Sequence, residues 1–381
     1  MQVTKKIGAD AGNDSLKLYL EEENYEGKKE LEVMNVIAPG YKRRTLGTEK
    51  GHLSNLLDVT IQSEGKELGR YFVGGLAFKE NREDLIEKSK KDKKAKSLDT
   101  IILIMTGCAY ALYDPNNLEK TENVALGTLL PTEEYFYEDE DLVEIFEKNF
   151  KGKSYEVTFN SPAFNGAKIT INIVDDEITP ESAAGHLAVV YNAEGGFNEG
   201  MEKFKDETII GIFIGSITTE ISVFQNGEFL DKGFKGIPLG TSDPLDKILY
   251  DLGLLDIMSR HQLDFTIRNN KKLIANINGK TEDMTEKLKI SKERRFNEFV
   301  KTLVNRINNR LAPSGINIEL ANRINMGGGG SITCFDSFKK EFNAGNTELV
   351  KNARFANALG ALYSIVSKQN DKEAAADEVL G

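Results

Sequence analysis

The chain has 381 residues, of which 60 are acidic and 49 basic, so its net charge is −11. This length predicts two domains, and the acidity disfavours general binding to phosphate backbones, although a local basic patch would be compatible with it. The cysteines, Cys108 and Cys334, and the three histidines have no metal-ligand spacing, which excludes a disulfide scaffold and a zinc motif and suits a reducing cytoplasm.

The most informative feature is an internal repeat. Residues 7–20 and 210–223 each contain an apolar strand, a glycine with small polar residues, and a second apolar stretch. Each continues through a polar turn into a third strand, at 30–38 and 228–234, and Asn226-Gly227 is a strong hairpin signal. Two such units half a chain apart predict a duplicated α/β fold with a cleft between its halves. The alternative is chance similarity between glycine-rich turns.

The other expected elements follow in chain order. Before the second copy we expect a strand ending at 71–73, a solvated lysine-rich helix or loop at 81–96, a buried helix at 99–113, and strands at 154–159 and 168–174. The apolar run Thr100–Tyr113 is shorter than the roughly 20 residues of a membrane span, and we expect no signal peptide. Thr179 as N-cap and Pro180 in the first turn predict a helix start.

The region after the second copy is expected to be mainly helical. Residues 244–312 have charged helical faces, 319–326 form a strand that runs into Gly327–Gly330, 354–368 form an amphipathic helix, and 369–381 form a frayed tail.

The first glycine turn has the residue types of a phosphate site, namely Asp10, Gly12, Asn13, Ser15 and Lys17. Glycine lets the backbone approach a phosphate, and exposed N–H groups and hydroxyls donate to its oxygens. Lys17 can neutralise phosphate charge, and Asp10 can hold a hydrated Mg²⁺.

The second turn offers similar donors in Gly215, Ser216, Thr218 and Thr219. Neither turn is specific alone, because a glycine-containing hairpin is usually structural. Together with the four-glycine run they indicate a nucleotide site, although the Walker A and Rossmann motifs are absent.

Two further features have a structural and a functional interpretation. Gly327–Gly330 can admit a flat adenosine against bare backbone, or can be a flexible loop. Glu181, in the first turn of the expected helix, interacts favourably with the helix dipole. The residues alone favour this structural interpretation over a catalytic one.

Taken in order, these motifs resemble the actin superfamily, specifically the ParM-type plasmid-segregating bacterial actins, over nearly the whole chain. The motifs are the DxG…K turn at Asp10, the PES sequence at 180–182, the GxxTT turn at 215–219, GGGG, and FANALG at 355–360. YFVGGLA at 71–77 and LPTEEYF at 130–136 also resemble family segments.

The resemblance implies an actin-like (ribonuclease-H-like) fold that binds ATP or GTP with Mg²⁺ between two domains, with domain I at 1–180, domain II at 181–340, and a C-terminal helix with its tail at 341–381. Asp10, Gly12 and Lys17 would form the first phosphate loop, and Gly215, Ser216 and Thr218 the second. Gly327, Gly328 and Gly329, with Gly240, would hold the nucleoside. Glu181 would orient the attacking water, which favours its functional interpretation.

One departure concerns the second loop. The family opens this loop with Asp-x-Gly, whereas this chain has Phe213-Ile214-Gly215. Phenylalanine cannot hold metal-bound or attacking water, so the resemblance implies slow hydrolysis unless an acid such as Glu220 or Asp14 compensates. Nucleotide binding would be less affected, because the backbone donors remain.

The resemblance implies a cytoplasmic, filament-forming ATPase or GTPase that segregates plasmid DNA through a DNA-binding adaptor, without contacting DNA or a membrane itself. The six lysines in 88–96 and the acidic stretch 133–147 are either solvated faces or contacts between subunits. Alternatives are a metabolic kinase of the same superfamily, a chaperone-like ATPase, disfavoured because no substrate-binding domain follows, and a non-hydrolysing scaffold.

Overall fold

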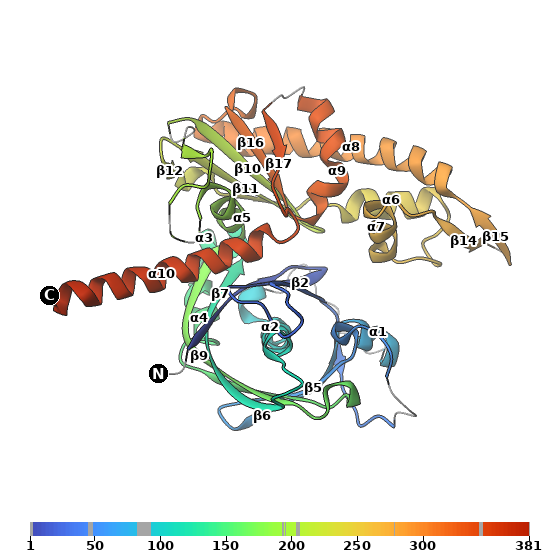
Figure 1. Cartoon of the computed structure of the whole chain (residues 1–381). Coiled ribbons are helices and arrows are strands. Elements are labelled where there is room, and N and C mark those ends of the chain that lie inside the picture. Colours follow the sequence, from blue (N-terminus) through green and yellow to red (C-terminus); the bar gives the residue numbers. More distant parts are fainter. Residues whose placement is uncertain are drawn as a thin grey trace. The chain divides into compact units, whose positions relative to one another are not determined.

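The computed structural model describes residues 3–44, 49–81, 93–192, 194, 196–202, 206–277, 279–342 and 346–380. The chain forms two compact units (Figure 1). Unit 1 comprises Met1–Phe197 and Asn357–Gly381, and unit 2 comprises Asn198–Ala356. Unit 2 is therefore inserted into the sequence of unit 1. The expected boundary between the domains, after residue 180, would place the helix that begins at Glu181 in domain II. In the structure this helix lies in unit 1.

Unit 1 is built on a nine-stranded sheet with the order β3-β2-β1-β7-β9-β8-β5-β6-β4. Its strands are β1 (Thr4–Ala11), β2 (Ser15–Leu20), β3 (Glu30–Met34), β4 (Ile37–Pro39), β5 (Leu57–Ser63), β6 (Lys66–Val73), β7 (Glu119–Leu130), β8 (Ser154–Phe159) and β9 (Lys168–Pro180). Its helices are α1 (Gly75–Glu80), α2 (Leu98–Leu112), α3 (Thr132–Phe136), α4 (Leu142–Glu147), α5 (Glu181–Val190) and α10 (Ala356–Leu380), with 3-10 turns η1 (Leu53–Asn55), η2 (Lys94–Lys96) and η3 (Pro162–Phe164).

The strands of unit 1 curve around α2 in Figure 1. This helix contacts β1, β2, β5, β8 and β9, and its side chains are buried from Thr100 onward. The predicted apolar helix is thus confirmed as the centre of the core. Among the residues that the structure describes, no helix is both long and apolar enough to cross a bilayer.

Unit 2 has a smaller sheet, in the order β12-β11-β10-β16-β17, with β13 also paired to β11. Its strands are β10 (Thr208–Ile214), β11 (Thr219–Gln225), β12 (Glu228–Phe229), β13 (Lys235–Ile237), β16 (Arg323–Gly327) and β17 (Thr347–Leu349), and β14 (Ile274–Ile277) pairs with β15 (Lys280–Asp283). Its helices are α6 (Ser242–Asp251), α7 (Arg260–Arg268), α8 (Thr285–Leu311) and α9 (Gly329–Phe342), with 3-10 turns η5 (Asp231–Gly233), η6 (Ala312–Ser314) and η7 (Ile318–Leu320).

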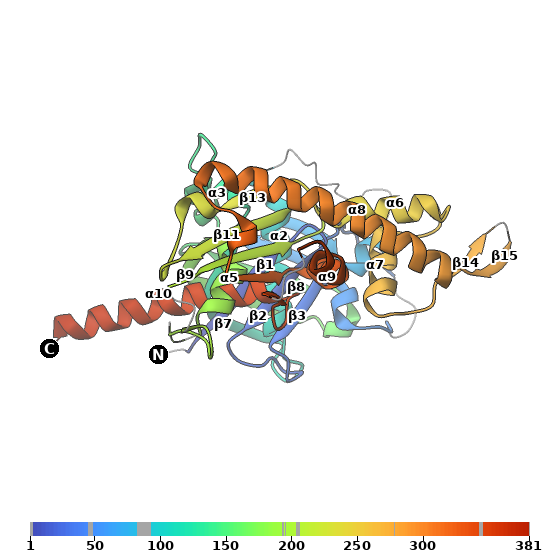
Figure 2. The same cartoon turned by 90° about the horizontal axis from the view of Figure 1, so that it is seen from above.

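The long helix α8, which Figure 2 shows along its length, packs on α6 and α9. Asp251 at the end of α6 accepts hydrogen bonds from Ser291, from Arg294 and from Nε and Nη2 of Arg295 on α8. These bonds, chiefly those from Arg295, hold the pKa of the Asp251 carboxyl well below its usual range.

The internal repeat is confirmed by the pairing of the strands. β1 pairs antiparallel with β2 and parallel with β7, and β10 pairs antiparallel with β11 and parallel with β16. The hairpin between β11 and β12 turns at Asn226-Gly227, where both residues have positive φ as the sequence predicts. Two glycine turns therefore lie at equivalent places in two similarly ordered sheets.

Helix α10 lies directly on glycines of the unit 1 sheet. Gly8 of β1 and Gly127 of β7 are neighbours in register, and a Cβ on them would lie 2.1 Å from the Ala358 carbonyl oxygen and 1.9 Å from that of Ala361. Gly360 of α10 in turn faces the backbone of Ala184 on α5. The backbones touch because these positions lack side chains, so glycine is required there.

Two local expectations are wrong. Thr179 is no N-cap, because it and Pro180 continue β9 in parallel register with β7, and α5 begins at Glu181. The region 244–312 is mainly helical, as expected, and it also contains the pairing of β14 with β15. Helix α10 continues to Leu380 where a frayed tail was expected, in a segment rich in strong helix formers.

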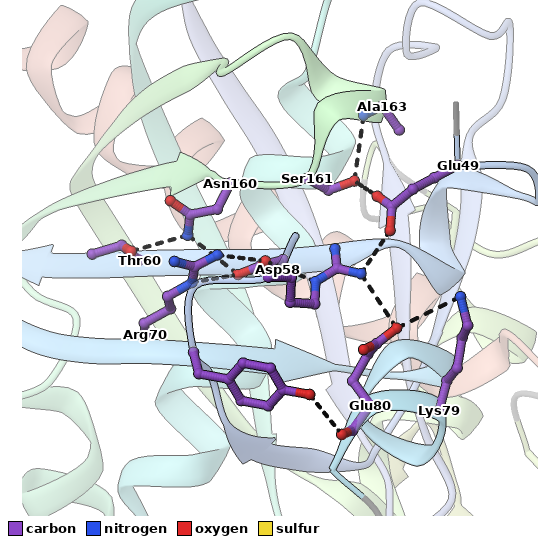
Figure 3. A network of polar contacts seen from close by, with 11 residues as sticks. Glu49, Asp58, Thr60, Arg70, Lys79, Glu80, Asn160, Ser161 and Ala163 are labelled. Atoms are coloured by element: carbon purple, nitrogen blue, oxygen red, sulfur yellow. Dashed lines mark hydrogen bonds and ion pairs between the residues drawn. The ribbon is translucent and has the colours of Figure 1, made fainter. Parts of the chain in front are cut away.

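A buried ion-pair network joins β5, β6 and the segment that precedes them (Figure 3). Asp58 accepts two hydrogen bonds from Arg70, at 2.8 and 2.7 Å, and one each from Arg43 and Asn160. Arg43 also pairs with Glu49 and Glu80. Because the charges are paired and hydrogen-bonded, the network can stay buried and fix this edge of unit 1.

A second charged cluster joins β9 to α10. Lys368 of α10 donates to the Asp176 carbonyl oxygen at 2.5 Å and pairs with Glu177, while Lys372 pairs with Asp175 at 2.6 Å. Both carboxylate oxygens of Asp176 are buried without a hydrogen-bond partner among the described residues. Burial, with the nearby charge of Glu147, raises the pKa of Asp176 to about 6, against the opposing attraction of Lys368.

We expect Asp176→Asn to stabilise the protein at pH 7.5 by about 1–2 kcal/mol and to have little effect near pH 4. The folded state keeps its proton up to a higher pH than the unfolded state, whose pKa is near 3.8. The wild-type carboxyl therefore costs stability as pH rises through about 6. Urea unfolding at several pH values measures this difference. Asp175→Asn is the control and should destabilise at pH 7.5, because Asp175 is paired with Lys372.

Candidate functional site

The first turn joins β1 to β2 in unit 1. Asp10 and Lys17 are opposite each other in register, with Lys17 Nζ 3.8 Å from Asp10 Oδ2. Gly12 lies against both side chains, since a Cβ on it would be 3.5 Å from Lys17 Nζ and 3.8 Å from Asp10 Oδ1. The structure therefore brings Asp10, Gly12 and Lys17 together. Asn13 is exposed at the bend, and Ser15 is buried as the first residue of β2.

Glu181 is the first residue of α5, directly after the end of β9. Its Oε1 accepts a hydrogen bond from Lys94 Nζ at 2.8 Å, and both side chains are largely buried, with exposed fractions of 10% for Lys94 and 14% for Glu181. Burial acts to lower the pKa of Lys94, but the charges of Glu181 and then Asp10 outweigh it and hold this pKa above its usual value. Asp10, Lys94 and Glu181 thus belong to one electrostatic cluster.

The lysine-rich segment and the acidic segment pair with each other within the chain. Lys93 pairs with Glu138 and Lys96 with Glu140. Glu134 accepts hydrogen bonds from the backbone N–H groups of Lys94 and Ala95 at 2.9 and 3.0 Å. The paired side chains of Lys93, Lys96, Glu138 and Glu140 remain partly exposed, as expected of a solvated face, and contacts between subunits stay a prediction. Residues 82–92 of the lysine-rich stretch lie outside the described residues.

The second turn joins β10 to β11 in unit 2. Gly215 N–H donates to the Thr218 carbonyl at 2.8 Å, and Ser242 N–H donates to the Ser216 carbonyl at 2.8 Å. Gly240 lies so close to this turn that a Cβ on it would be 2.3 Å from the Ser216 carbonyl oxygen. The structure therefore brings Gly215, Ser216, Thr218 and Gly240 together.

The register places Phe213 at the position that Asp10 has in the first turn. Phe213 is opposite Glu220, as Asp10 is opposite Lys17. The Phe213 ring is buried and lies over Gly327, where a Cβ would be 2.3 Å from Cε1 of the ring. Glu220 is buried as well and shares the sheet face of Phe213, since cross-strand neighbours point to the same side. The carboxylate of this pair is therefore on β11 and not on β10.

The four-glycine run ends β16 and begins α9. Gly328 has φ +81°, and a Cβ on it would be 2.5 Å from the Ile214 carbonyl oxygen. Close packing therefore accounts for glycine at 327 and 328 without any ligand. Gly329, by contrast, faces the end of the flexible Arg354 side chain at 3.3 Å.

Of the expected site residues, Asp10 is the one suited to hold a hydrated Mg²⁺, and it would do so through water bound to the metal. Among the described residues, no three His, Cys, Asp or Glu side chains cluster as metal ligands.

Sequence reasoning missed three residues of the candidate site. Lys94 was one of six lysines without a pattern, and only the fold shows that it meets Glu181. Asn35 donates to the Gly12 carbonyl at 2.7 Å, and Thr241 N–H donates to the Gly215 carbonyl at 3.1 Å. No local signal marks these contacts, because each joins segments distant in sequence.

Solved structures show which fold the chain has. The actin-like protein Alp7A superposes with a TM-score of 0.77 over 100% of both chains at 16% identity. A non-polymerisable quadruple mutant of pCBH ParM gives 0.68 at 19% identity, covering 96% of this chain and 100% of its own. Bacillus thuringiensis ParM with AMPPNP gives 0.67 at 17% identity, covering 97% of this chain and 99% of its own. The expected actin-like α/β fold is confirmed.

Sequence comparisons add nothing to this result. No protein-family model matches the chain, and no curated protein matches it. The identities of the structural neighbours are low, so the likeness establishes the fold and leaves the activity to be argued from the residues.

Proposed function

We propose that the chain is a cytoplasmic, nucleotide-dependent, filament-forming actin-like NTPase that segregates DNA, such as a plasmid, through a DNA-binding adaptor. The observation that carries the proposal is the pair of glycine turns of the same build at the ends of the equivalent strands β1 and β10. Each turn presents backbone N–H groups and small polar side chains of the kind that bind phosphates. Bacillus thuringiensis ParM, which has the same fold, has been solved with ADP, AMPPNP and ATP.

In this proposal the residues of the first turn bind the phosphates of ATP or GTP. Lys17 would neutralise phosphate charge, and Asp10 would hold Mg²⁺ through water, with the metal offsetting charge on the phosphate oxygens when bound. In the second turn, Gly215, Ser216 and Thr218 would donate to phosphate oxygens. Gly329, with Gly327, Gly328 and Gly240, would lie against the nucleoside.

Glu181 would orient the attacking water. Its carboxylate accepts a hydrogen from the water, so that the oxygen is held in line with the terminal phosphorus. The new bond joins water oxygen to phosphorus, the bond from phosphorus to the bridging oxygen breaks, and the water proton ends on the released phosphate. Positioning supplies most of the catalysis that such a reaction requires.

Filament formation is proposed from the shared fold and from the neighbour whose name records a non-polymerisable mutant. Repeated head-to-tail contacts that do not close into a ring produce a helical filament. The acidity of the chain agrees with an adaptor that contacts the DNA in its place.

The test is sedimentation of the purified chain with ATP, GTP or no nucleotide, combined with measurement of phosphate release and electron microscopy. We expect nucleotide-dependent pelleting, visible filaments and release of phosphate. Failure to bind either nucleotide, measured by calorimetry, would overturn the whole proposal. Release of ADP stimulated by a sugar would instead identify a metabolic kinase.

A non-hydrolysing scaffold is the second candidate, and Phe213 favours it. The buried aromatic ring stands where Asp10 stands in the first turn, and it has no oxygen with which to hold water. Filaments that form with nucleotide but release no phosphate would identify this case. Phosphate release by the wild-type chain would show that hydrolysis in this protein does not need a carboxylate at position 213.

A further inference from the structure

Within the described part of the chain, the side chain bonded to Glu181 is Lys94, through a charged hydrogen bond at 2.8 Å. The bond uses Glu181 Oε1, so Oε2 is the oxygen left for another donor. An ammonium group has three donors and no acceptor, so Lys94 cannot itself activate water, but it can fix the plane of a carboxylate. Both side chains are largely buried, which strengthens the pairing relative to one at the surface.

The backbone of Lys94 is fixed as firmly as its side chain. Glu134 of α3 accepts from the N–H groups of Lys94 and Ala95, and Ala95 is fully buried. The neighbouring pairs Lys93–Glu138 and Lys96–Glu140 hold the same 3-10 turn to the segment that follows α3. Lys94 therefore stands on a turn anchored on both sides, as a residue that orients another one must.

We propose that Lys94 is a positioning residue for hydrolysis: it holds the Glu181 carboxylate by Oε1 so that Oε2 faces the attacking water. The inference rests on the proposed function and goes beyond it, because it assigns a role to a residue outside both glycine turns. Lys94 acts through Glu181, so its loss should slow the chemical step more than it weakens nucleotide binding.

The electrostatics of the cluster support this role. Lys94 is charged, since the carboxylates of Glu181 and Asp10 raise its pKa against the effect of burial. Without the lysine, Glu181 would lose its charged partner in a largely buried site and would turn toward other donors. The geometry at Oε2 would then no longer be defined.

The test uses the full-length chain with four variants, Lys94→Met, Lys94→Arg, Lys96→Met and Glu181→Gln. Phosphate release is measured over a range of ATP and GTP concentrations, and circular dichroism confirms folding. We expect Lys94→Met to lower kcat at least about 10-fold with KM changed by less than about 3-fold. Lys94→Arg should restore much of the rate, because a guanidinium also donates to a carboxylate.

Lys96→Met is the matched control. It removes an exposed ion pair two residues away on the same turn, so its kcat should equal that of the wild type. If Lys96→Met lowers kcat as much as Lys94→Met does, the effect belongs to the turn as a whole and the proposal is wrong. If Lys94→Met raises KM and leaves kcat unchanged, Lys94 binds nucleotide and does not position Glu181, which also overturns it.

Failure of this inference is distinct from failure of the proposed function. Loss of turnover in Glu181→Gln with full turnover in Lys94→Met would reject the role of Lys94 alone. Full turnover in Glu181→Gln would reject the role of Glu181 and that of Lys94 with it. If Lys94→Met does not fold, Lys94→Gln, which keeps a neutral donor, takes its place, with the same expected split between kcat and KM.

Discussion

Glu181→Gln is expected to lower phosphate release by at least about 100-fold while nucleotide affinity changes little. The amide has nearly the shape of the carboxylate but is a weaker acceptor for the hydrogen of the attacking water. Lys94 can still donate to the amide oxygen, so the local fold should survive. Filaments should then assemble with nucleotide and persist, because the product that weakens them forms slowly.

This prediction is checked by single-turnover phosphate release, with nucleotide affinity from calorimetry and filament lifetime from light scattering. Glu140→Gln is the control, since this exposed carboxylate pairs with Lys96 in the same acidic segment. Its turnover should match the wild type. Filaments of Glu181→Gln that disassemble at the normal rate would show that Glu181 does not position the water.

Gly360→Ala is expected to destabilise unit 1 by about 3 kcal/mol or more, although alanine is the better helix former by about 1 kcal/mol. A Cβ at this position would lie 1.7 Å from the Ala184 carbonyl oxygen and 2.3 Å from its carbon. Both atoms are backbone, so relief requires α10 and α5 to move apart and the packing of α10 on Gly8 and Gly127 to loosen.

Urea unfolding followed by circular dichroism measures this loss of stability. Ser367→Ala, at an exposed position of the same helix, is the control and should be neutral or slightly stabilising. If Gly360→Ala unfolds at the same urea concentration as Ser367→Ala, the close contact between α10 and α5 is absent in solution.

Much of the fold could be predicted from the sequence, because its strongest signals are local. The repeat, the buried helix and the Asn226-Gly227 turn depend on patterns within short windows, and all three are confirmed, the helix at 98–112 where 99–113 was expected. The end of β9 could not be found in this way. Thr179 and Pro180 have the form of a helix start, but pairing with β7 overrides that preference.

The candidate site was only partly visible in the sequence. The turn glycines stand out because their chemistry is local, whereas Lys94 meets Glu181 across 87 positions of chain. Phe213 was seen as a lost carboxylate, but its packing on Gly327 depends on the parallel pairing of β10 with β16. Glycine at 327 and 328 is also required by packing against Phe213 and Ile214, which no local pattern shows, and the contact of these glycines with a nucleoside stays a prediction.

The insertion of unit 2 into unit 1 has a consequence for synthesis. A nascent chain that has reached Phe197 carries every strand of the nine-stranded sheet, but the helix that covers Gly8 and Gly127 begins only at Ala356. The unit that starts first on the ribosome is therefore completed last, after the whole of the inserted unit has been made. Until then the sheet at Gly8 and Gly127 is open to water and to chaperones. This stretch of translation is therefore the period in which the nascent chain is most exposed to misfolding.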